Sequence, residues 1–319
     1  MKHHPKLNKI IEIEKVLAKD LSILSMSLML SLSLSPLHQT KVIQALKKES
    51  YNQSQLLFKQ PDNVLVYKQL KVKKTEKQKY AQVQRLLNKQ YNKKNLGIYI
   101  YSLKDGSSAS INGDKIFHAA STGKLPILLY TQKLINEKKI NPYKKYPYID
   151  KFNNKKRNKF YYIRGGTGVL QYQKLGKKFS IDTIMQWTCK YSDNQGANFL
   201  AFYIANEYDQ TMIDYIEGIL QHKWDLFHVS AKDNVLLLEQ IYKTKGRLIN
   251  YLSHTVYDND RLPKYLPVKV AHKIGDLDNL HHDCSIVYTK QPYIICVMSK
   301  NSNNEMIANL SKEVYDILK

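Results

Sequence analysis

Segments with the hydrophobic pattern of β-strands lie near both ends of the chain, and this placement constrains the fold more than any other feature. The early stretches are residues 96–103 and 108–112, and the late ones are 268–273, 283–288 and 293–299. Turn or loop residues separate neighbouring stretches, as expected for hairpins. The pattern predicts one antiparallel sheet built from two remote parts of the chain, which must therefore meet across a single cleft.

Helical periodicity accounts for much of the remaining sequence, over residues 77–91, 117–136, 181–221 and 304–318. Residues 141–165 are polar, aromatic and basic, without a clear period. The predicted fold class is therefore α/β of the α+β type. We expect a five-stranded antiparallel sheet flanked by helices, with an all-helical subdomain inserted between the two groups of strands.

An uncharged apolar run, LSILSMSLMLSLSLSPL, covers residues 21–37 and follows a net-positive segment. This order predicts a signal peptide or membrane anchor over residues 1–37, and hence a protein secreted or anchored at the cell surface. A buried or interfacial Leu/Ser-rich helix is the alternative, because Asp20 adjoins the run and no small-residue cleavage site follows. Residues 38–76 are polar and Lys-rich, so we expect a basic spacer before a domain over 77–319.

The chain is strongly basic, with 50 Lys and Arg against 27 Asp and Glu in 319 residues and a net charge of +23. Such a charge favours anionic partners, and anionic cell-wall polymers are the expected ones for an exported protein. No helix-turn-helix, zinc finger or RNA-binding aromatic motif is present, so nucleic acid is not expected as a partner. The oligomeric state is not indicated.

Ser121 and Lys124 form an S-x-x-K sequence near the start of the predicted 117–136 helix. Residues three apart lie on one helical face, so their side chains are neighbours. A Ser hydroxyl is a poor nucleophile until a neighbour takes its proton, and a Lys whose pKa is lowered can do so. A helix-capping Ser beside a solvated Lys is the alternative, and this short pattern alone does not separate the two.

Two further motifs carry polar side chains suited to a site. The turn Ser192–Asp193–Asn194 offers a hydroxyl to relay a proton, an amide to hold a substrate amide, and a carboxylate to brace the loop. The segment 272–276, HKIGD, ends a predicted apolar strand with a Lys that can fix a substrate carboxylate and a Gly that permits close approach. Taken singly, the two motifs are equally typical of a helix cap and of a solvated strand end.

The three motifs together resemble a known family. S-x-x-K, S-D-N and K-T-G, in this order, mark the penicillin-recognising serine enzymes, and this chain has STGK, YSDN and HKIGD. Over residues 77–319 it resembles in particular the class A β-lactamase-like serine hydrolases of Gram-positive bacteria. The resemblance implies a β-lactamase/transpeptidase-like fold without metal or cofactor. It also implies a β-lactam or a D-Ala-D-Ala-type peptidoglycan peptide as substrate.

The resemblance also implies a role for each motif residue. Ser121 would attack a carbonyl to form an acyl-enzyme, Lys124 would be the acylation base, and Ser192 would relay the proton to the leaving nitrogen. Lys273 would attract the substrate carboxylate and tune the electrostatics of the site. The implied substrate contacts are Asn194 for the side-chain amide, Ile274 and Gly275 along the strand, and the backbone N–H of Asp276, which with that of Ser121 would form an oxyanion hole.

Two departures from the family pattern bear on activity. Ile274 stands where the family has Thr or Ser, and losing that hydroxyl's bond to a carboxylate costs roughly 1.5–3 kcal/mol. The family's loop Glu lies in an E-x-x-L-N pattern that has no full match here, and Glu217, the nearest, lies in an apolar helical pattern. We therefore expect acylation followed by slow hydrolysis. The alternatives are a true β-lactamase and a catalytically degenerate module that binds cell-wall peptide.

The three cysteines and a histidine pair carry no expected chemistry. Cys189 lies in a helical segment and is expected in the core. If Tyr288 faces Tyr293, the thiols of Cys284 and Cys296 point to opposite faces of a hairpin, whereas a register one residue different would let them pair. The sequence His281–His282–Asp283 has no further ligands spaced to complete a metal site.

Overall fold

The core of the protein is a five-stranded antiparallel sheet in the order β2-β1-β9-β8-β7. The computed structural model describes residues 75–163 and 165–319. The strands are β1 (Leu96–Ser102), β2 (Ser108–Ile111), β7 (Val270–Leu277), β8 (Leu280–Val287) and β9 (Tyr293–Ser299). The two remote groups of strands join where β1 pairs with β9, which confirms the predicted fold class.

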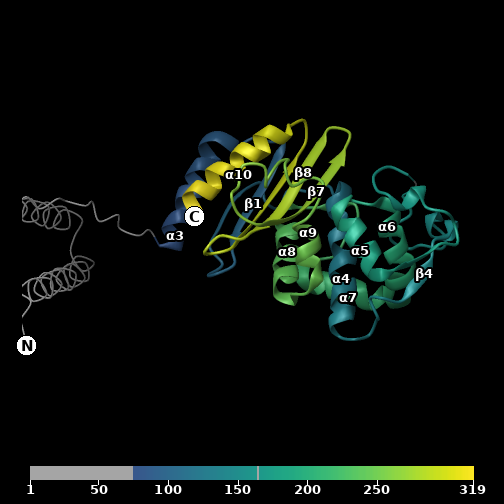
Figure 1. Cartoon of the computed structure of the whole chain (residues 1–319). Helices are drawn as coiled ribbons and strands as arrows, with labels where there is room; N and C mark the ends of the chain where they lie inside the picture. Colours follow the sequence, from purple (N-terminus) through teal and green to yellow (C-terminus); the bar gives the residue numbers. More distant parts are fainter. Residues whose placement is uncertain (1–74, 164) are drawn as a thin grey trace, which may run out of the picture. The chain divides into compact units, whose positions relative to one another are not determined.

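Two terminal helices cover one face of this sheet (Figure 1). They are α3 (Glu76–Leu86), which continues as a π-helical turn over Leu87–Tyr91, and α10 (Asn304–Leu318). Side chains alternate between the two faces of a strand. Ile295 and Val297 of β9 therefore pack with the terminal helices, while Ile294, Cys296 and Met298 face the other layer.

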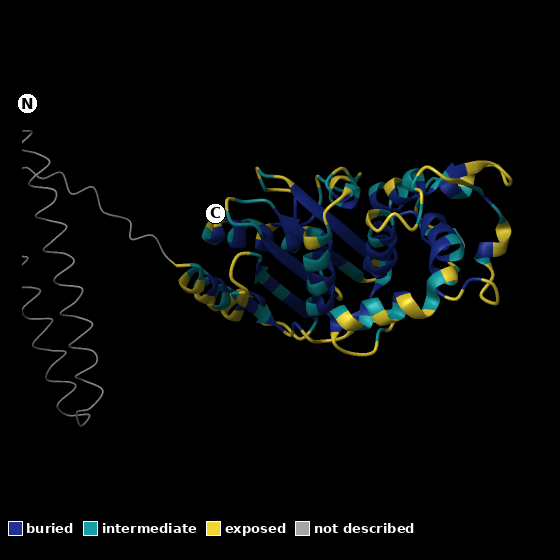
Figure 2. Ribbon diagram, turned by 90° about the horizontal axis from the view of Figure 1, so that it is seen from below, coloured by how far each residue is buried: buried dark blue, intermediate teal, exposed yellow. Residues whose placement is uncertain are grey.

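The opposite layer is helical, and Figure 2 shows the buried strands enclosed between helices. Its helices are α4 (Leu125–Asn136), α5 (Ile181–Lys190), α6 (Asn194–Leu200), α7 (Asp209–Leu220), α8 (Ala231–Thr244) and α9 (Arg247–Leu252). A π-helical turn, Ala201–Ala205, follows α6. The helices α4 to α7 form the group farther from the sheet, as the predicted helical subdomain requires (Figure 1).

Short elements complete the fold. Two-stranded ladders join β3 (Phe117–His118) to β6 (His228–Val229) and β4 (Lys145–Pro147) to β5 (Lys178–Ser180). Single 3₁₀ turns lie at Ala120–Lys124, Asp150–Asn153, Leu170–Tyr172 and Asn206–Tyr208. Within the part of the chain that the structure describes, no helix has the length and apolar character needed to cross a bilayer.

Several predicted elements have different limits in the structure. The helix expected over 117–136 is divided, because Phe117–His118 forms a strand with β6 and only Leu125–Asn136 is α-helical. The strand expected over 268–273 begins at Val270 and runs through the whole HKIGD motif to Leu277. The leader over 1–37 and residues 38–74 of the spacer predicted over 38–76 lie outside the described residues. The last two residues of that spacer are the cap and the first residue of α3, Thr75 and Glu76.

The register of the last hairpin also differs from the one considered first. Val287 rather than Tyr288 faces Tyr293, because the Tyr288 N–H donates to the Lys269 carbonyl at 3.0 Å and leaves the hairpin. Cys284 therefore faces Cys296, and the two form a disulfide between neighbouring strands. Cys189 is free and buried in the core, as expected.

Candidate active site

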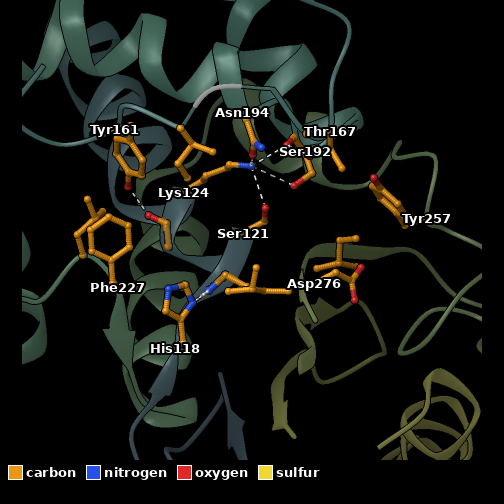
Figure 3. Close-up of a pocket in the computed structure, with 17 residues that line it drawn as sticks. His118, Ser121, Lys124, Tyr161, Thr167, Ser192, Asn194, Phe227, Tyr257 and Asp276 are labelled. Carbon is orange, nitrogen blue, oxygen red and sulfur yellow. Dashed lines mark hydrogen bonds between the residues drawn. The ribbon is translucent and has the colours of Figure 1, made fainter. Parts of the chain in front are cut away.

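The predicted nucleophile lies on a strained turn between β3 and α4. Ser121 belongs to the 3₁₀ turn Ala120–Lys124, and Ala120 before it has a φ of +46°, a conformation that L-residues rarely adopt. The turn opens into a cavity of about 290 Å³. Lys124, Asn194 and Ser192 lie on one side of Ser121, whereas His118 and Asp276 lie on the other (Figure 3).

Lys124 connects the first motif with the second. Its Nζ lies 2.8 Å from Ser121 Oγ, 2.6 Å from the Ser192 carbonyl oxygen and 2.6 Å from Asn194 Oδ1. The carbonyl and amide oxygens only accept hydrogen bonds. A neutral Lys124 therefore directs its two N–H bonds at these oxygens and its lone pair at the Ser121 hydroxyl, which is the orientation a base needs.

The surroundings of Lys124 favour this neutral form. The side chain is fully enclosed, and burial lowers its pKa well below the usual value. The neighbouring ammonium of Lys273 lowers the pKa further, while the carboxylate of Asp193 opposes the shift. The site thus holds an amine whose neutral form is favoured and which can accept a proton from Ser121.

Ser192 lies between the two lysines. Its Oγ is 2.7 Å from Lys273 Nζ and 3.4 Å from Lys124 Nζ, and its φ is +54°. Burial lowers the pKa of Lys273 to about 8. The Lys273 ammonium also donates to the Ile274 carbonyl at 2.9 Å, and it lies behind Ser192 rather than in the cavity wall.

Asp193 braces the loop that carries Ser192. Its buried carboxylate accepts hydrogen bonds from the N–H groups of Val169, Leu170 and Gly196 at 2.7–2.9 Å. Gly168 has a φ of +112°, and a Cβ there would lie 2.2 Å from the Asp193 carboxyl carbon. A residue with a side chain is therefore excluded at this point of the GGTG segment.

Both the oxygen and the nitrogen of the Asn194 side-chain amide form hydrogen bonds within the site. Its Oδ1 accepts from Lys124, and its Nδ2 donates to the Gly165 carbonyl at 2.9 Å. One amide hydrogen remains for a substrate, because an amide group has two.

The strand β7 forms the wall opposite the second motif. Ile274 and Asp276 line the cavity, while Gly275 does not. A Cβ on Gly275 would lie 3.1 Å from the Ala119 carbonyl oxygen and 3.2 Å from Thr122 Cγ2. The expectation that Gly275 admits a substrate backbone is therefore corrected, since the missing side chain lets β7 pack against the nucleophile turn.

Carboxylates are scarce around Ser121. Asp276 is the one acidic residue that lines the cavity within the described chain, and its Oδ2 accepts from Arg261 at 2.6 Å. Glu217 lies on α7 and binds Lys223 at 3.0 Å and the Trp224 N–H at 3.1 Å, outside the cavity wall. In residues 75–163 and 165–319, no three His, Cys, Asp or Glu side chains converge as a metal site.

The cavity also contains residues that the motifs did not indicate. His118 accepts the Ala120 N–H at 3.1 Å, and burial and the nearby His228 lower its pKa. Leu226 and Phe227 come from the loop before β6, and Tyr161 donates to the Gly123 carbonyl. His118 lies three residues before Ser121, and the others lie in segments without a motif. A basic, aromatic stretch around Tyr161 was the only signal in the sequence.

Comparisons with known proteins agree with this geometry. The family model described as the β-lactamase enzyme family matches residues 78–318. A solved PBP-A point mutant, in an acyl-enzyme complex with penicillin G, is 24% identical with a TM-score of 0.61, covering 75% of this chain and 95% of that one. No curated protein sequence matches the chain.

Two solved β-lactamases share the same fold. The enzyme from Sphaerobacter thermophilus is 15% identical with a TM-score of 0.61, covering 75% of this chain and 96% of that one. The extended-spectrum β-lactamase TLA-3 is 20% identical with a TM-score of 0.60, covering 75% of this chain and all of its own. Because the family match spans most of the sequence and the three motifs meet in one cavity, this chain belongs to the β-lactamase enzyme family.

Proposed function

We propose that the protein is a serine acyl-transfer hydrolase that forms an acyl-enzyme on Ser121 with a β-lactam or a D-Ala-D-Ala-type peptide. The observation that carries the proposal is the bonding of Lys124. Its two nearest oxygen acceptors leave the nitrogen lone pair for the Ser121 hydroxyl 2.8 Å away. The PBP-A acyl-enzyme with penicillin G supports the same chemistry on this fold.

The side chains of the site account for every proton that moves and every bond that changes during acylation. Ser121 Oγ bonds to the substrate carbonyl carbon while its proton passes to Lys124 Nζ. The C–N bond then breaks as the Ser192 hydroxyl gives its proton to the leaving nitrogen, and Lys124 returns a proton to Ser192 Oγ, 3.4 Å away. Backbone N–H groups of Ser121 and Asp276 would stabilise the oxyanion, each contributing roughly 3–4 kcal/mol.

Hydrolysis of this ester should be slow. Water needs a base beside the acyl carbon, and the only carboxylate in the described cavity wall, Asp276, is held by Arg261. The apolar side chains of Leu226 and Ile274 occupy wall positions that offer no proton acceptor. We infer a long-lived acyl-enzyme rather than rapid destruction of antibiotic.

The test combines intact mass with fluorescent penicillin labelling. The wild-type protein should gain the mass of one whole penicillin and keep it for hours, and Ser121→Ala should show neither adduct nor label while retaining its melting temperature. Fast, steady nitrocefin hydrolysis would contradict the slow hydrolysis of the acyl-enzyme and favour a true β-lactamase. Binding of D-Ala-D-Ala peptide without any adduct would favour a non-catalytic binding module.

We propose that this chemistry takes place outside the cytoplasm, where peptidoglycan peptides are available. The basic segment and apolar run over residues 1–37 support this location. Fractionation of cells that express the full chain tests it, and recovery in the cytoplasm alone would contradict it.

A further inference from the structure

A second cavity, of about 510 Å³, adjoins the active-site cavity and shares His118 and Leu277 with it. We call it the lysine pocket and define it by Lys94, Lys115, Ile116, Leu277, Asp278 and Lys300 among its lining residues. None of these six belongs to the three sequence motifs.

The direction of β7 places the lysine pocket on the acyl side of the reacting carbonyl. Lys273 and Ile274 lie at the second-motif end of the site, and Asp276 lies beside Ser121. The strand then continues through Leu277 to its end at the lysine pocket. A substrate that lies along β7 with its carboxylate towards Lys273 must therefore send its acyl chain past Leu277.

The lysine pocket carries an excess of positive charge. Three lysines and a single acidic residue, Asp278, line it. Lys115 donates to the Lys94 carbonyl and lies 5.5 Å from the centre of the Phe117 ring. Among the described residues, none of the three lysines forms a salt bridge, so their charge is available to a ligand.

Apolar side chains lie beside these charges. Ile116 is 54% exposed and Leu277 is 42% exposed, and both line the pocket. Exposed apolar groups that adjoin a catalytic cavity are typical of ligand-binding surfaces. The pocket thus suits a chain with an apolar stem and an anionic end.

Building on the proposed function, we propose that the lysine pocket binds the acyl part of the substrate through a carboxylate located upstream of the scissile carbonyl. The substrate class is then an acyl donor whose peptide or side chain ends in, or carries, an acidic group. Lys94 and Lys300 attract the carboxylate, while Ile116 and Leu277 contact the stem.

The test uses two penicillins with the same nucleus and side chains of equal length. One carries a glutaryl side chain ending in a carboxylate, and the other a pentanoyl side chain ending in a methyl group. The second-order rate constant of Ser121 acylation is measured for each by intact mass. The double variant Lys94→Gln/Lys300→Gln should lower the glutaryl rate by about 3- to 10-fold and the pentanoyl rate by less than 2-fold.

A matched control is the double variant Lys104→Gln/Lys290→Gln, which removes two exposed lysines at the β1–β2 turn and the β8–β9 loop. It should leave the ratio of the two rates unchanged, whereas 0.5 M salt should lower that ratio in the wild type. If both penicillins acylate Ser121 and the Lys94/Lys300 variant keeps the wild-type ratio, the pocket assignment is overturned and the proposed function stands. If neither penicillin acylates the wild type, the proposed function is contradicted, and the pocket assignment that rests on it is withdrawn with it.

Discussion

The two active-site lysines need opposite protonation states, although both are buried next to Ser192. Lys124 can accept the Ser121 proton only when it is neutral, and Lys273 can attract a carboxylate only when it is charged. Burial and mutual repulsion lower the pKa of Lys124 well below normal, whereas the pKa of Lys273 falls to about 8. We therefore expect the proposed acylation to be fastest in a window of pH between the two titrations.

We expect the rate constant of acylation by penicillin to follow a bell-shaped pH profile. The rate rises as Lys124 loses its proton and falls about tenfold per unit above pH 8 as Lys273 loses its own. Fluorescent penicillin labelling between pH 5 and 10 measures this. Lys273→Arg, which stays charged, should shift the falling limb upward. A wild-type rate that stays constant to pH 10 would contradict the assignment.

The motif residues could be predicted because short motifs fix side-chain identity and order along the chain. Ser121, Lys124, Ser192 and Asn194 all line one cavity, and Lys273 bonds to Ser192 directly behind it. The orientation of Gly275 could not be predicted, since a motif does not say which neighbour its Cα faces. His118 and Leu226 were not predicted as residues of the cavity wall, because their positions there depend on tertiary packing alone.

Among the elements, β7 controls the geometry of the site most directly. As the edge strand of the sheet, it presents one side to the cavity and packs Gly275 against the nucleophile turn. The width of the cleft between β7 and the second-motif loop depends on this contact.

Replacing Gly275 with Ala should separate β7 from the nucleophile turn. The added Cβ would lie 3.1 Å from the Ala119 carbonyl, which is tighter than ordinary contact. We expect a loss of about 1–2 kcal/mol in the free energy of unfolding and a drop of about tenfold in acylation rate. Chemical denaturation and penicillin labelling measure the two effects.

A matched control is Gly218→Ala in α7, where an added Cβ meets no atom within 4 Å. Ala favours a helix over Gly by up to about 1 kcal/mol, so this variant should be as stable as the wild type or more so, with unchanged acylation. Gly275→Ala with wild-type acylation would show that the close packing of β7 does not set the site geometry.

Element types were easier to predict than element limits. Residues 304–318 and 293–299 have the limits read from their hydrophobic period, because each has one clearly buried face. The residues of β3 look helical in the sequence, yet they pair with β6 across more than 100 residues, and no local pattern encodes that pairing. The helices α8 and α9 lie in residues 222–267, where the hydrophobic pattern predicted no element.

At the scale of the whole molecule, the site forms because three segments that are remote in the sequence lie side by side in the fold. The nucleophile turn follows the first two strands, the second motif comes from the helical group, and the third comes from the last sheet strands. This agrees with the order of patterns in the sequence. The sequence shows where basic residues are dense along the chain, whereas their exposure is seen only in the structure.

One stretch near the site is unusually basic. Residues 144–178 contain eleven Lys or Arg and a single acid, Asp150. Lys151, Lys155, Lys156 and Arg157 are exposed within it. Charges that lie within a Debye length, about 8 Å at physiological salt, act together on an anionic polymer. This stretch should therefore contribute more to polyanion binding than the same number of scattered lysines.

We expect the full chain to bind immobilised poly(glycerol phosphate) and to be released by salt. Changing Lys151, Lys155, Lys156 and Arg157 to Gln should lower the eluting salt concentration clearly more than changing four exposed lysines outside this stretch, Lys89, Lys104, Lys269 and Lys290. The two sets are matched because each removes the same net charge. Acylation of Ser121 by penicillin should be unchanged in both. Equal shifts would show that net charge alone, rather than the 144–178 stretch, governs attachment.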